Sequence, residues 1–326
     1  MNVGAWMEEA TGAEVADAPV LVQELWSGYG RIERWFLRDA AGAQASQRSV
    51  ILKVVDPGFQ GQKHPRGWAS TRSDERKRKS YGIERTFYRR YLPDLPGVPR
   101  TAARIAEKET PTGGMLILED LNHSGFSARR SAGVDAEIQA CIRWLAAFHA
   151  AFLGREPKGL WERGTYWHLE TRPDELAAIQ DERLRAAAPG IDARLGAARF
   201  RTLVHGDAKI ANFCFRGGGP RDAAQEVAAV DFQYVGGGVG VQDLSYFLGS
   251  CMDEDRLERD ADGYLDFYFE ELRAALDERH DGPNIEEEWR SLWPDSWADF
   301  HRFLAGWAPG HWKLSSYSDR MLRLVL

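Results

Sequence analysis

The chain has 326 residues, of which 44% are hydrophobic and 28% are charged, and its formal net charge is −7. This length exceeds what one hydrophobic core commonly organises, so the sequence predicts two lobes or domains. The acidic balance argues against general nucleic-acid binding, which needs a basic surface. No apolar segment is long enough to span a bilayer, so we expect no membrane partner.

The cysteines give no sign of a disulfide framework. Cys141, Cys214 and Cys251 are widely spaced and odd in number. Their spacing does not suit paired metal ligands, so we expect buried thiols in a reducing compartment. The N-terminal stretch lacks a basic start followed by an apolar run, and so shows no signal peptide. These features predict a cytoplasmic protein, and nothing in the sequence indicates an obligate protein partner.

The first third of the chain is rich in predicted strands. Residues 1–19 are small and acidic without a clear period, and we expect them to be loosely ordered. The stretch Val20–Leu37 is rich in aliphatic and aromatic residues and is broken by Ser27-Gly-Tyr-Gly30, which predicts two strands joined by a glycine turn. Such a turn either lies over phosphates or simply connects two strands.

A lysine interrupts the next predicted strand, Ser49–Val55, which is apolar on both faces. A buried lysine needs an anionic partner, because an unpaired buried charge is costly. Lys53 therefore either binds an anion or extends its ammonium to solvent at the edge of the sheet. From the residues alone, both interpretations stay open.

A basic segment leads into the following helix. Residues 56–73 are rich in Pro and Gly and irregular, and basic side chains recur over 63–79. They form either a solvated face or a docking surface for an anionic partner. The predicted helix runs over 73–91 and carries Glu84, which either reaches Lys53 or pairs along its own helix.

Two further strands and then helices follow. Strands are predicted over Pro99–Ala106 and Met115–Glu119, and the second leads into the polar Asp120-Leu-Asn122. This suits a hinge whose backbone binds adenine, or an ordinary strand end. The run Ile138–Phe152 is apolar at helical spacing, and we expect His149 on it to be a core histidine rather than a catalyst.

The stretch Leu203–Phe215 places polar residues where packing would favour apolar ones. Asp207 and Asn212 lie in its middle, and Asp231 ends the next predicted strand. Each of these side chains offers oxygen to a metal ion or a hydroxyl group. This spacing of Asp, Asn and Asp is typical of a kinase-type site that holds a nucleophile and magnesium.

The last part of the chain is predicted to be helical. Val235–Gly240 is expected to be a flexible connector, and Asp243 is well placed to cap the helix that follows it. An acidic helix is predicted over Asp253–Leu276, and further helices rich in Trp and Phe follow. These aromatic residues either pack in a core or line a substrate pocket.

Several of these stretches resemble the aminoglycoside phosphotransferase and choline kinase group, and the resemblance is closest to its ecdysteroid kinase-like branch. The resemblance extends over residues 20 to 250. Gln233 and the helix motif with Glu84 are the features most similar to that branch. The matching stretches are Glu84-Arg-Thr-Phe-Tyr88, Ile117-Leu-Glu-Asp-Leu121, Leu145-Ala-Ala-Phe-His-Ala150, His205-Gly-Asp207 with Asn212, Val230-Asp-Phe-Gln233 and Asp243-Leu-Ser-Tyr-Phe247.

The resemblance implies an α+β, protein-kinase-like two-lobe fold with ATP bound between the lobes. A small antiparallel sheet would form the nucleotide-binding N-lobe over residues 20–122, with a hinge at its end and a flexible N-terminus at 1–19. The larger, mainly helical C-lobe would span residues 123–326 and hold the catalytic loop and the acceptor pocket.

The resemblance also implies roles in nucleotide binding. Lys53 would hold the α- and β-phosphates of ATP and pair with Glu84. The predicted hinge residues Glu119, Asp120 and Leu121 would bind adenine. Because a basic segment separates Lys53 from Glu84 in sequence, their pairing is an inference.

For phosphoryl transfer, the resemblance implies that Asp207 accepts or orients the proton of the substrate hydroxyl. Asn212 and Asp231 would coordinate Mg²⁺, and Asp243 would brace the catalytic loop, with His205 as a second supporting residue. Magnesium prefers a few hard oxygens completed by phosphate and water, which one Asn and one Asp match.

The expected activity is ATP- and magnesium-dependent transfer of the γ-phosphate to a hydroxyl of a small molecule. A protein kinase is disfavoured, because only twelve positions separate Asp231 from Asp243, too few for a long activation segment. A catalytically inactive nucleotide-binding protein is the other alternative. The acceptor stays open: acidic residues after Cys251 favour a cation, and abundant aromatic residues suit a flat apolar alcohol such as a sterol.

Overall fold

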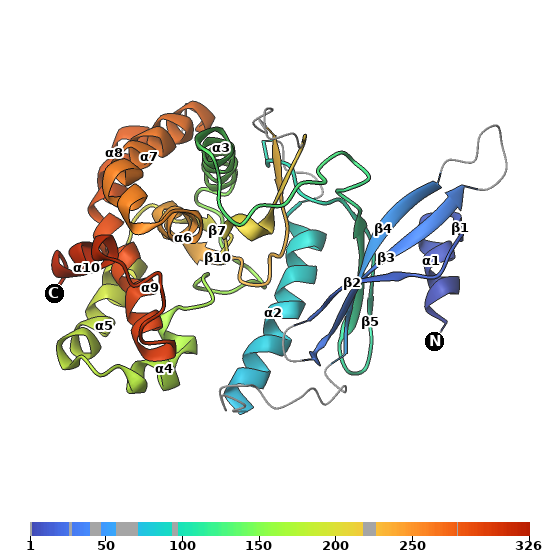
Figure 1. Cartoon of the computed structure of the whole chain (residues 1–326), viewed down its shortest axis with the longest axis horizontal. Helices are drawn as coiled ribbons and strands as arrows, with labels where there is room; N and C mark the ends of the chain where they lie inside the picture. The colour runs from blue at the N-terminus through green and yellow to red at the C-terminus, as the bar shows by residue number, and fades with distance from the viewer. Residues whose placement is uncertain are drawn as a thin grey trace. The chain divides into compact units, whose positions relative to one another are not determined.

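The computed structural model describes residues 2–25, 28–39, 47–56, 71–92, 97–217, 226–278 and 280–326. The chain divides into two compact units, the first made of Met1–Pro93 with Thr101–Ala128 and the second of Asp94–Arg100 with Arg129–Leu326. The first unit is built on a sheet and the second mainly on helices (Figure 1). This is the predicted α+β class.

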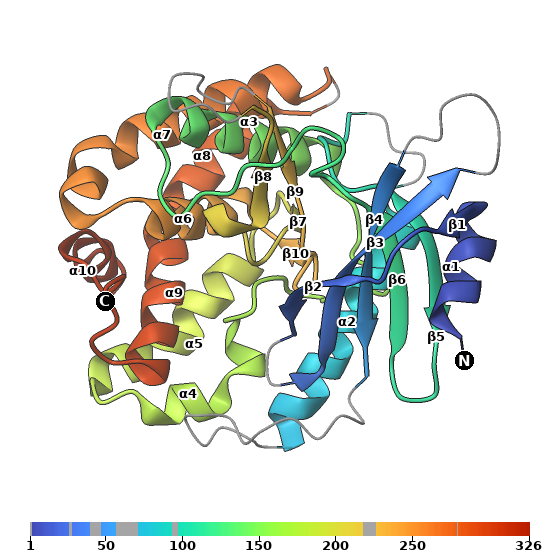
Figure 2. The ribbon, with the colours of Figure 1, turned by 45° about the vertical axis from the view of Figure 1, so that its right-hand side comes forward.

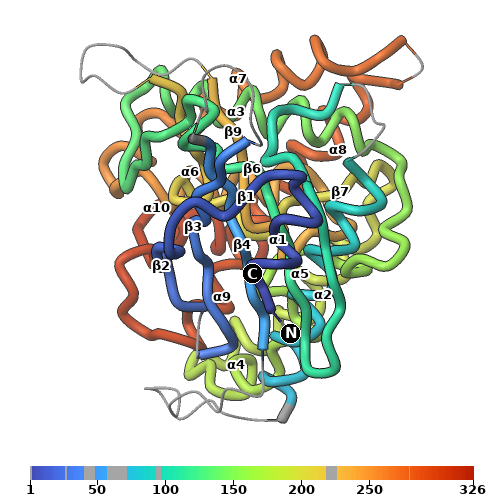
Figure 3. The backbone as a smooth tube through the Cα atoms, turned by 90° about the vertical axis from the view of Figure 1, so that its right-hand side faces the viewer, coloured from blue at the N-terminus to red at the C-terminus, as the bar shows by residue number. Residues whose placement is uncertain are grey.

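The first unit is built on one antiparallel sheet. Its strand order is β1-β3-β4-β6-β5, with β2 also paired to β3. Figure 3 shows β3 and β4 side by side. The strands are β1 (Ala13–Val15), β2 (Val20–Glu24), β3 (Gly30–Asp39), β4 (Gln47–Val55), β5 (Arg104–Glu109) and β6 (Gly114–Glu119). Because β4 pairs with both β3 and β6, it is a central strand, which suits a strand that is apolar on both faces.

Successive side chains of β4 point to opposite faces of this sheet. Val50 and Leu52 join a core cluster with Trp6 and Met7 of helix α1 (Val3–Thr11). Lys53 instead bonds to helix α2 (Thr71–Arg90). Successive residues of a strand point to opposite faces, so α1 and α2 cover opposite sides of β4.

The structure differs from the expected loosely ordered N-terminus. Helix α1 is capped at its N-terminus by Asn2, whose side chain accepts a hydrogen bond from the backbone N–H of Ala5, and at its C-terminus by Gly12 in the left-handed conformation. Trp6 and Met7 are buried against the sheet. These two adjacent residues are the buried residues of α1, and two positions are too few to show a helical period in the sequence.

Some predicted segments lie outside the described residues. These are Ser27 of the glycine turn and the basic insertion up to residue 70. The rest of the basic segment is the beginning of α2, where Arg78 pairs with Asp74. Strand β5 begins at Arg104, later than predicted.

The second unit consists mainly of helices around two short strand pairs. Helix α3 packs along α7, and α9 packs against α4, α5, α6 and α10 (Figure 2). None of the described helices is long and apolar enough to cross a bilayer. The helices are α3 (Asp135–Ala151), α4 (Pro173–Ala178), α5 (Glu182–Gly196), α6 (Gly240–Cys251), α7 (Glu254–Ala275), α8 (Gly282–Ser291), α9 (Trp293–Trp307) and α10 (Ser316–Arg323).

The two strand pairs frame the polar stretch singled out in the sequence. Strand β7 (Thr202–Val204) pairs with β10 (Gly236–Gly238), and β8 (Phe213–Phe215) pairs with β9 (Val227–Ala229). The glycine-rich segment is therefore a buried strand, and the expected flexible connector is wrong. A Cβ on Gly236 would lie 2.3 Å from the backbone oxygen of Trp161, so glycine here permits close backbone packing.

Candidate active site

The loop after β7 depends on a glycine. Gly206 has φ of 78°, and a Cβ there would lie 2.1 Å from the backbone oxygen of Tyr234. Only glycine tolerates both the left-handed backbone and this close approach. The conformation of His205-Gly-Asp207 is thus set by the glycine between His205 and Asp207.

Asp243 holds this loop from the first turn of α6. Its fully buried carboxylate accepts hydrogen bonds from the backbone N–H groups of His205, at 2.5 Å, and Gly206, at 2.9 Å. The prediction that Asp243 caps its own helix is wrong, since the N-cap residue is Val239. The carboxylate is instead used by the loop.

His149 of α3 completes the buried network around Asp243. Its Nε2 lies 3.2 Å from Asp243 Oδ2, and its Nδ1 lies 2.8 Å from the hydroxyl of Tyr268. Burial raises the pKa of Tyr268 well above its usual value, so the hydroxyl keeps its proton and donates to Nδ1. His149 therefore donates from Nε2 to the carboxylate and, as expected, is a core histidine.

His205 links the loop to the segment that carries Asp231. Its Nδ1 accepts a hydrogen bond from the backbone N–H of Asp207, at 3.3 Å. Its Nε2 therefore carries the proton and donates to the backbone oxygen of Val230, at 3.0 Å. The backbone N–H of Val230 in turn donates to the backbone oxygen of Asn212, at 3.0 Å. These bonds fix the positions of Asp207, Asn212 and Asp231 relative to one another.

The carboxylate of Asp207 faces three donors. Oδ1 accepts from the hydroxyl of Tyr246 at 2.9 Å, and Oδ2 accepts from Lys209 Nζ at 2.9 Å and from Asn212 Nδ2 at 3.2 Å. Burial raises the pKa of Tyr246 well above its usual value, so this hydroxyl acts as a donor. The buried carboxylate is thus held in one orientation.

Lys209 is a partner of Asp207 rather than a side chain pointing freely to solvent. Burial alone would lower its pKa, but the carboxylates of Asp207 and Asp231 outweigh that effect and raise it. The ammonium is therefore charged beside Asp207. Its side chain keeps 39% of its surface exposed, so it can also contact a ligand.

Asn212 and Asp231 lie at the same end of the β8–β9 pair. The register pairs Phe213 with Ala229, the residues that lie just inside Asn212 and Val230. Asn212 donates from Nδ2 to the backbone oxygen and to Oδ2 of Asp207. Its own Oδ1 has no hydrogen-bond partner in the described ranges. This leaves an oxygen available for a metal ion.

Asp231 has an uncommon backbone conformation for a residue other than glycine, with φ of 72°. Its Oδ1 accepts a hydrogen bond from Gln233 Nε2 at 2.5 Å, which orients the side chain. Strained conformations of this kind concentrate at functional sites. Across the described ranges, no three His, Cys, Asp or Glu side chains form a metal-binding group, so Asn212 and Asp231 would need phosphate and water to complete the coordination of Mg²⁺.

The first unit contains the predicted ion pair. Lys53 Nζ lies 2.6 Å from Glu84 Oε2, with side-chain exposures of 7% and 3%. Glu84 therefore reaches Lys53, and Lys53 does not extend to solvent. The ammonium also lies over the ring of Tyr81, 5.6 Å from its centroid.

We expect Lys53→Met to destabilise the first unit by about 3 kcal/mol, because it leaves the buried carboxylate of Glu84 without its ammonium partner. The double variant Lys53→Met/Glu84→Met should recover most of this loss, since no charge is then left buried. Urea unfolding of Lys53→Met, Glu84→Met and the double variant measures the coupling energy between the two side chains. If the losses of the two single variants simply added up in the double variant, the ion pair would not stabilise the unit.

The predicted hinge residues use their side chains inside the first unit. Asp120 accepts from Arg34 Nε at 2.6 Å and from Ser49 Oγ at 2.7 Å. Burial alone would raise the pKa of Asp120, but these two donors outweigh it and lower the pKa. Glu119 accepts from Ser124 and from the backbone of Ala103. Leu121 is buried, so a contact of this segment with adenine would be made by its backbone.

Two residues near Asp207 were missed in the sequence. Tyr246 follows Asp243 by three positions on α6 and therefore faces the same side, which the helical spacing could have shown. Lys313 lies after α9, and its Nζ is 4.8 Å from the centre of the Tyr246 ring. Nothing in the local sequence signals that proximity.

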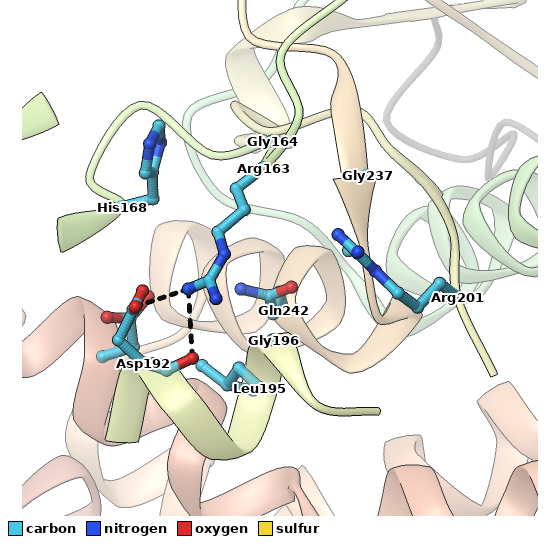
Figure 4. A pocket seen from close by; sticks show the side chains of 11 residues that line it. Arg163, Gly164, His168, Asp192, Leu195, Gly196, Arg201, Gly237 and Gln242 are labelled. Atoms are coloured by element: carbon cyan, nitrogen blue, oxygen red, sulfur yellow. Dashed lines mark hydrogen bonds and ion pairs between the residues drawn. The ribbon is translucent and has the colours of Figure 1, made fainter. Parts of the chain in front are cut away.

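A small cavity elsewhere in the second unit is too small to be an acceptor site. Its volume is about 20 Å³, enough for one water molecule. Arg163 on its wall pairs with Asp192 (Figure 4). The cavity is thus a feature of the packing of α5 against the β7–β10 pair.

The ecdysteroid kinase-like family model matches residues 167–280. The chain resembles this family. The matched span contains Asp207, Asn212, Asp231 and Asp243, so the predicted resemblance is confirmed over the second unit's polar loop. A search of curated protein sequences finds no match.

Two of the solved structures with similar folds can be aligned over nearly the whole chain. A microcompartment-associated aminopropanol kinase is 14% identical, with a TM-score of 0.50 over 99% of this chain and 94% of the other. An amicoumacin kinase in complex with AMP-PNP, Ca²⁺ and its ligand is 14% identical, with a TM-score of 0.54 over 100% and 92%. At this identity the likeness shows the fold, and the predicted protein-kinase-like fold is confirmed.

Proposed function

We propose that the protein is a cytoplasmic phosphotransferase that uses ATP and magnesium to phosphorylate a hydroxyl of a small molecule. The observation that carries this proposal is the buried Asp207, held by Tyr246, Lys209 and Asn212. Phosphoryl transfer depends on positioning and charge stabilisation more than on covalent chemistry, and this loop supplies a fixed carboxylate. The similar fold of two small-molecule kinases supports the assignment.

In this proposal Asp207 orients the acceptor hydroxyl and takes its proton at Oδ1 or Oδ2. Asn212 and Asp231 hold Mg²⁺, which when bound would neutralise charge on the phosphate oxygens. Lys53, fixed by Glu84, binds the phosphates of ATP. The backbone at Glu119 to Leu121 binds adenine, and Asp243 positions the loop without touching the substrate.

A protein kinase fits the second unit less well. From Asp231 the chain passes directly through β10 into α6, and every residue between Asp231 and Asp243 belongs to the buried structure or its short turns. No long segment is inserted where a protein kinase carries its activation loop. The acceptor in our proposal is therefore a small molecule.

The test is magnesium-dependent ATP consumption by the purified protein against a panel of aminoglycosides, macrolides, choline, sugars and steroids. We expect consumption with at least one class of acceptor and a phosphorylated product in its mass spectrum. Nucleotide binding without transfer to any acceptor would favour the catalytically inactive alternative. Absence of nucleotide binding would contradict both.

We expect Asp231→Ala to weaken the binding of magnesium and nucleotide together by at least about tenfold, because a hard carboxylate ligand is removed. Calorimetric titration with the non-hydrolysable analogue AMP-PNP, with and without Mg²⁺, measures the effect. The matched control is Asp253→Ala, which removes an exposed carboxylate from the beginning of α7. Affinity equal to that of the wild type would reject the metal assignment.

A further inference from the structure

Lys313 is a cation without an anionic partner in contact. Its Nζ lies over the rings of Tyr246, Phe300 and Trp312, at 4.8, 5.6 and 5.5 Å from their centroids. In the part of the chain that the structure describes, this ammonium makes no hydrogen bond and no ion pair. An ammonium held only by aromatic faces has lost much of its hydration and is stabilised mainly by the ring quadrupoles.

Tyr246 joins Lys313 to the catalytic carboxylate. Its ring lies under the ammonium of Lys313, while its hydroxyl donates to Asp207 Oδ1 at 2.9 Å. The two groups are thus one tyrosine ring apart. A molecule whose hydroxyl meets Asp207 would place its next few atoms within reach of Lys313.

The walls of this region are aromatic. Tyr246 and Phe300 belong to a core cluster with Trp167, Phe303 and Leu304. Trp312 is instead 61% exposed, an unusual fate for a tryptophan beside a core. The ammonium of Lys313 therefore lies between buried aromatic rings and the exposed Trp312.

The electrostatics favour an anion at this position. Burial has the largest effect on the pKa of Lys313, which is lowered to about 8 overall; Asp207 acts to raise this pKa and Lys209 acts to lower it. Burial also raises the pKa of Cys251 to about 12, so that thiol is neutral and gives no counter-charge. Lys209 pairs with Asp207, whereas the ammonium of Lys313 makes no ion pair in the described ranges, so Lys313 is the more available of these two cations for an anionic ligand.

We propose that Lys313 determines acceptor specificity by binding an anionic group, a carboxylate or phosphate, on an acceptor with an apolar or aromatic body. This inference rests on the proposed function and names the class of its substrate. It disfavours cationic acceptors such as aminoglycosides or choline. Two of the acidic residues after Cys251 have roles within the second unit, since Asp253 caps α7 and Glu254 accepts from the backbone of Ser316.

The test uses three probes that share a benzyl alcohol body: 4-(hydroxymethyl)benzoate, its uncharged amide and the cationic 4-(aminomethyl)benzyl alcohol. Their binding at pH 7 is measured by calorimetry and by quenching of tryptophan fluorescence. We expect the benzoate to bind at least tenfold tighter than the other two, since a charge-assisted hydrogen bond adds a factor of about 10 to 100. Equal or absent binding of the benzoate would overturn the proposal.

Variants of Lys313 separate its role from general charge effects. Lys313→Met should remove the preference for the benzoate, and Lys313→Arg should keep much of it. The matched control is Lys158→Met, which removes a lysine whose side chain is 81% exposed and should leave the preference unchanged. Loss of the preference in the control would contradict a local role for Lys313.

The nucleotide is the other source of anionic oxygens. If Lys313 bound the γ-phosphate instead, Lys313→Met would weaken AMP-PNP affinity, and this result would overturn the acceptor assignment. We expect that affinity to be unchanged. Transfer to neutral or cationic acceptors alone would reject this inference while leaving the proposed function intact, and no nucleotide binding would reject the function itself.

The binding of the benzoate should also depend on pH. Lys313 is charged below its pKa of about 8 and neutral above it, while the carboxylate stays ionised across this range. Affinity should therefore fall from pH 7 to pH 9 in the wild type. In Lys313→Arg the affinity should stay level, because the guanidinium keeps its charge.

Discussion

Asp207→Asn should lose phosphoryl transfer while keeping its affinity for magnesium and nucleotide. The amide cannot take the proton of the acceptor hydroxyl, and it would present N–H groups to Lys209 or Asn212, which are themselves donors. Removing a general base of this kind costs about 10²- to 10⁴-fold in rate. The measurement is kcat with the acceptor found by the panel, beside a calorimetric titration with AMP-PNP.

Tyr246→Phe is the matched control for this change. It removes one donor to Asp207 and leaves the carboxylate and its contacts with Lys209 and Asn212. We expect a smaller loss of rate, about tenfold, which corresponds to a single hydrogen bond. If Asp207→Asn turned over its acceptor at the wild-type rate, Asp207 would not be the group that handles the hydroxyl proton.

Asp243→Ala should cost the second unit about 5 kcal/mol or more, because three buried donors lose their acceptor and each orphaned group costs about 1–3 kcal/mol. The donors are the backbone N–H groups of His205 and Gly206 and the Nε2–H of His149. The midpoint of thermal unfolding should fall by on the order of 10 °C. Transfer activity should fall too, since the loop loses the contact that fixes it.

Thermal melts followed by tryptophan fluorescence measure this effect. Asp253→Ala is the comparison, because it removes a helix cap at the surface, worth about 1 kcal/mol. A loss in Asp243→Ala no greater than in Asp253→Ala would show that the buried carboxylate does not organise the loop.

The sequence pattern predicted strands, helices and the site motif correctly where local signals were strong. The apolar run of β4 predicted a strand buried on both faces, and the spacing of Ile138 to Phe152 predicted the long helix α3. The motif with Asp207, Asn212 and Asp231 is local too, because a tight loop and a short strand pair keep these residues close. Such features depend on neighbours in sequence, which a pattern can show.

The sequence pattern gave wrong predictions where a residue's local context suggests one role and its tertiary contacts give it another. The glycines of β10 suggested a flexible connector, yet their lack of side chains is what lets the backbone of Trp161 approach. Asp243 suggested a helix cap, yet its carboxylate accepts from a loop far back in the chain. Both outcomes depend on what packs against the residue, which composition does not contain.

The sequence by itself determined the class of fold and the resemblance to the ecdysteroid kinase-like family, since both rest on periodicity and on motifs short enough to see in one stretch. The tertiary structure alone decided how Asp207 is held and what surrounds it. Helix α6 brings Tyr246 to the carboxylate, and the segment after α9 brings Lys313 over the Tyr246 ring. The physical reason is that long-range packing, rather than local propensity, chooses which side chains meet, so the features that bear on the acceptor became visible only in three dimensions.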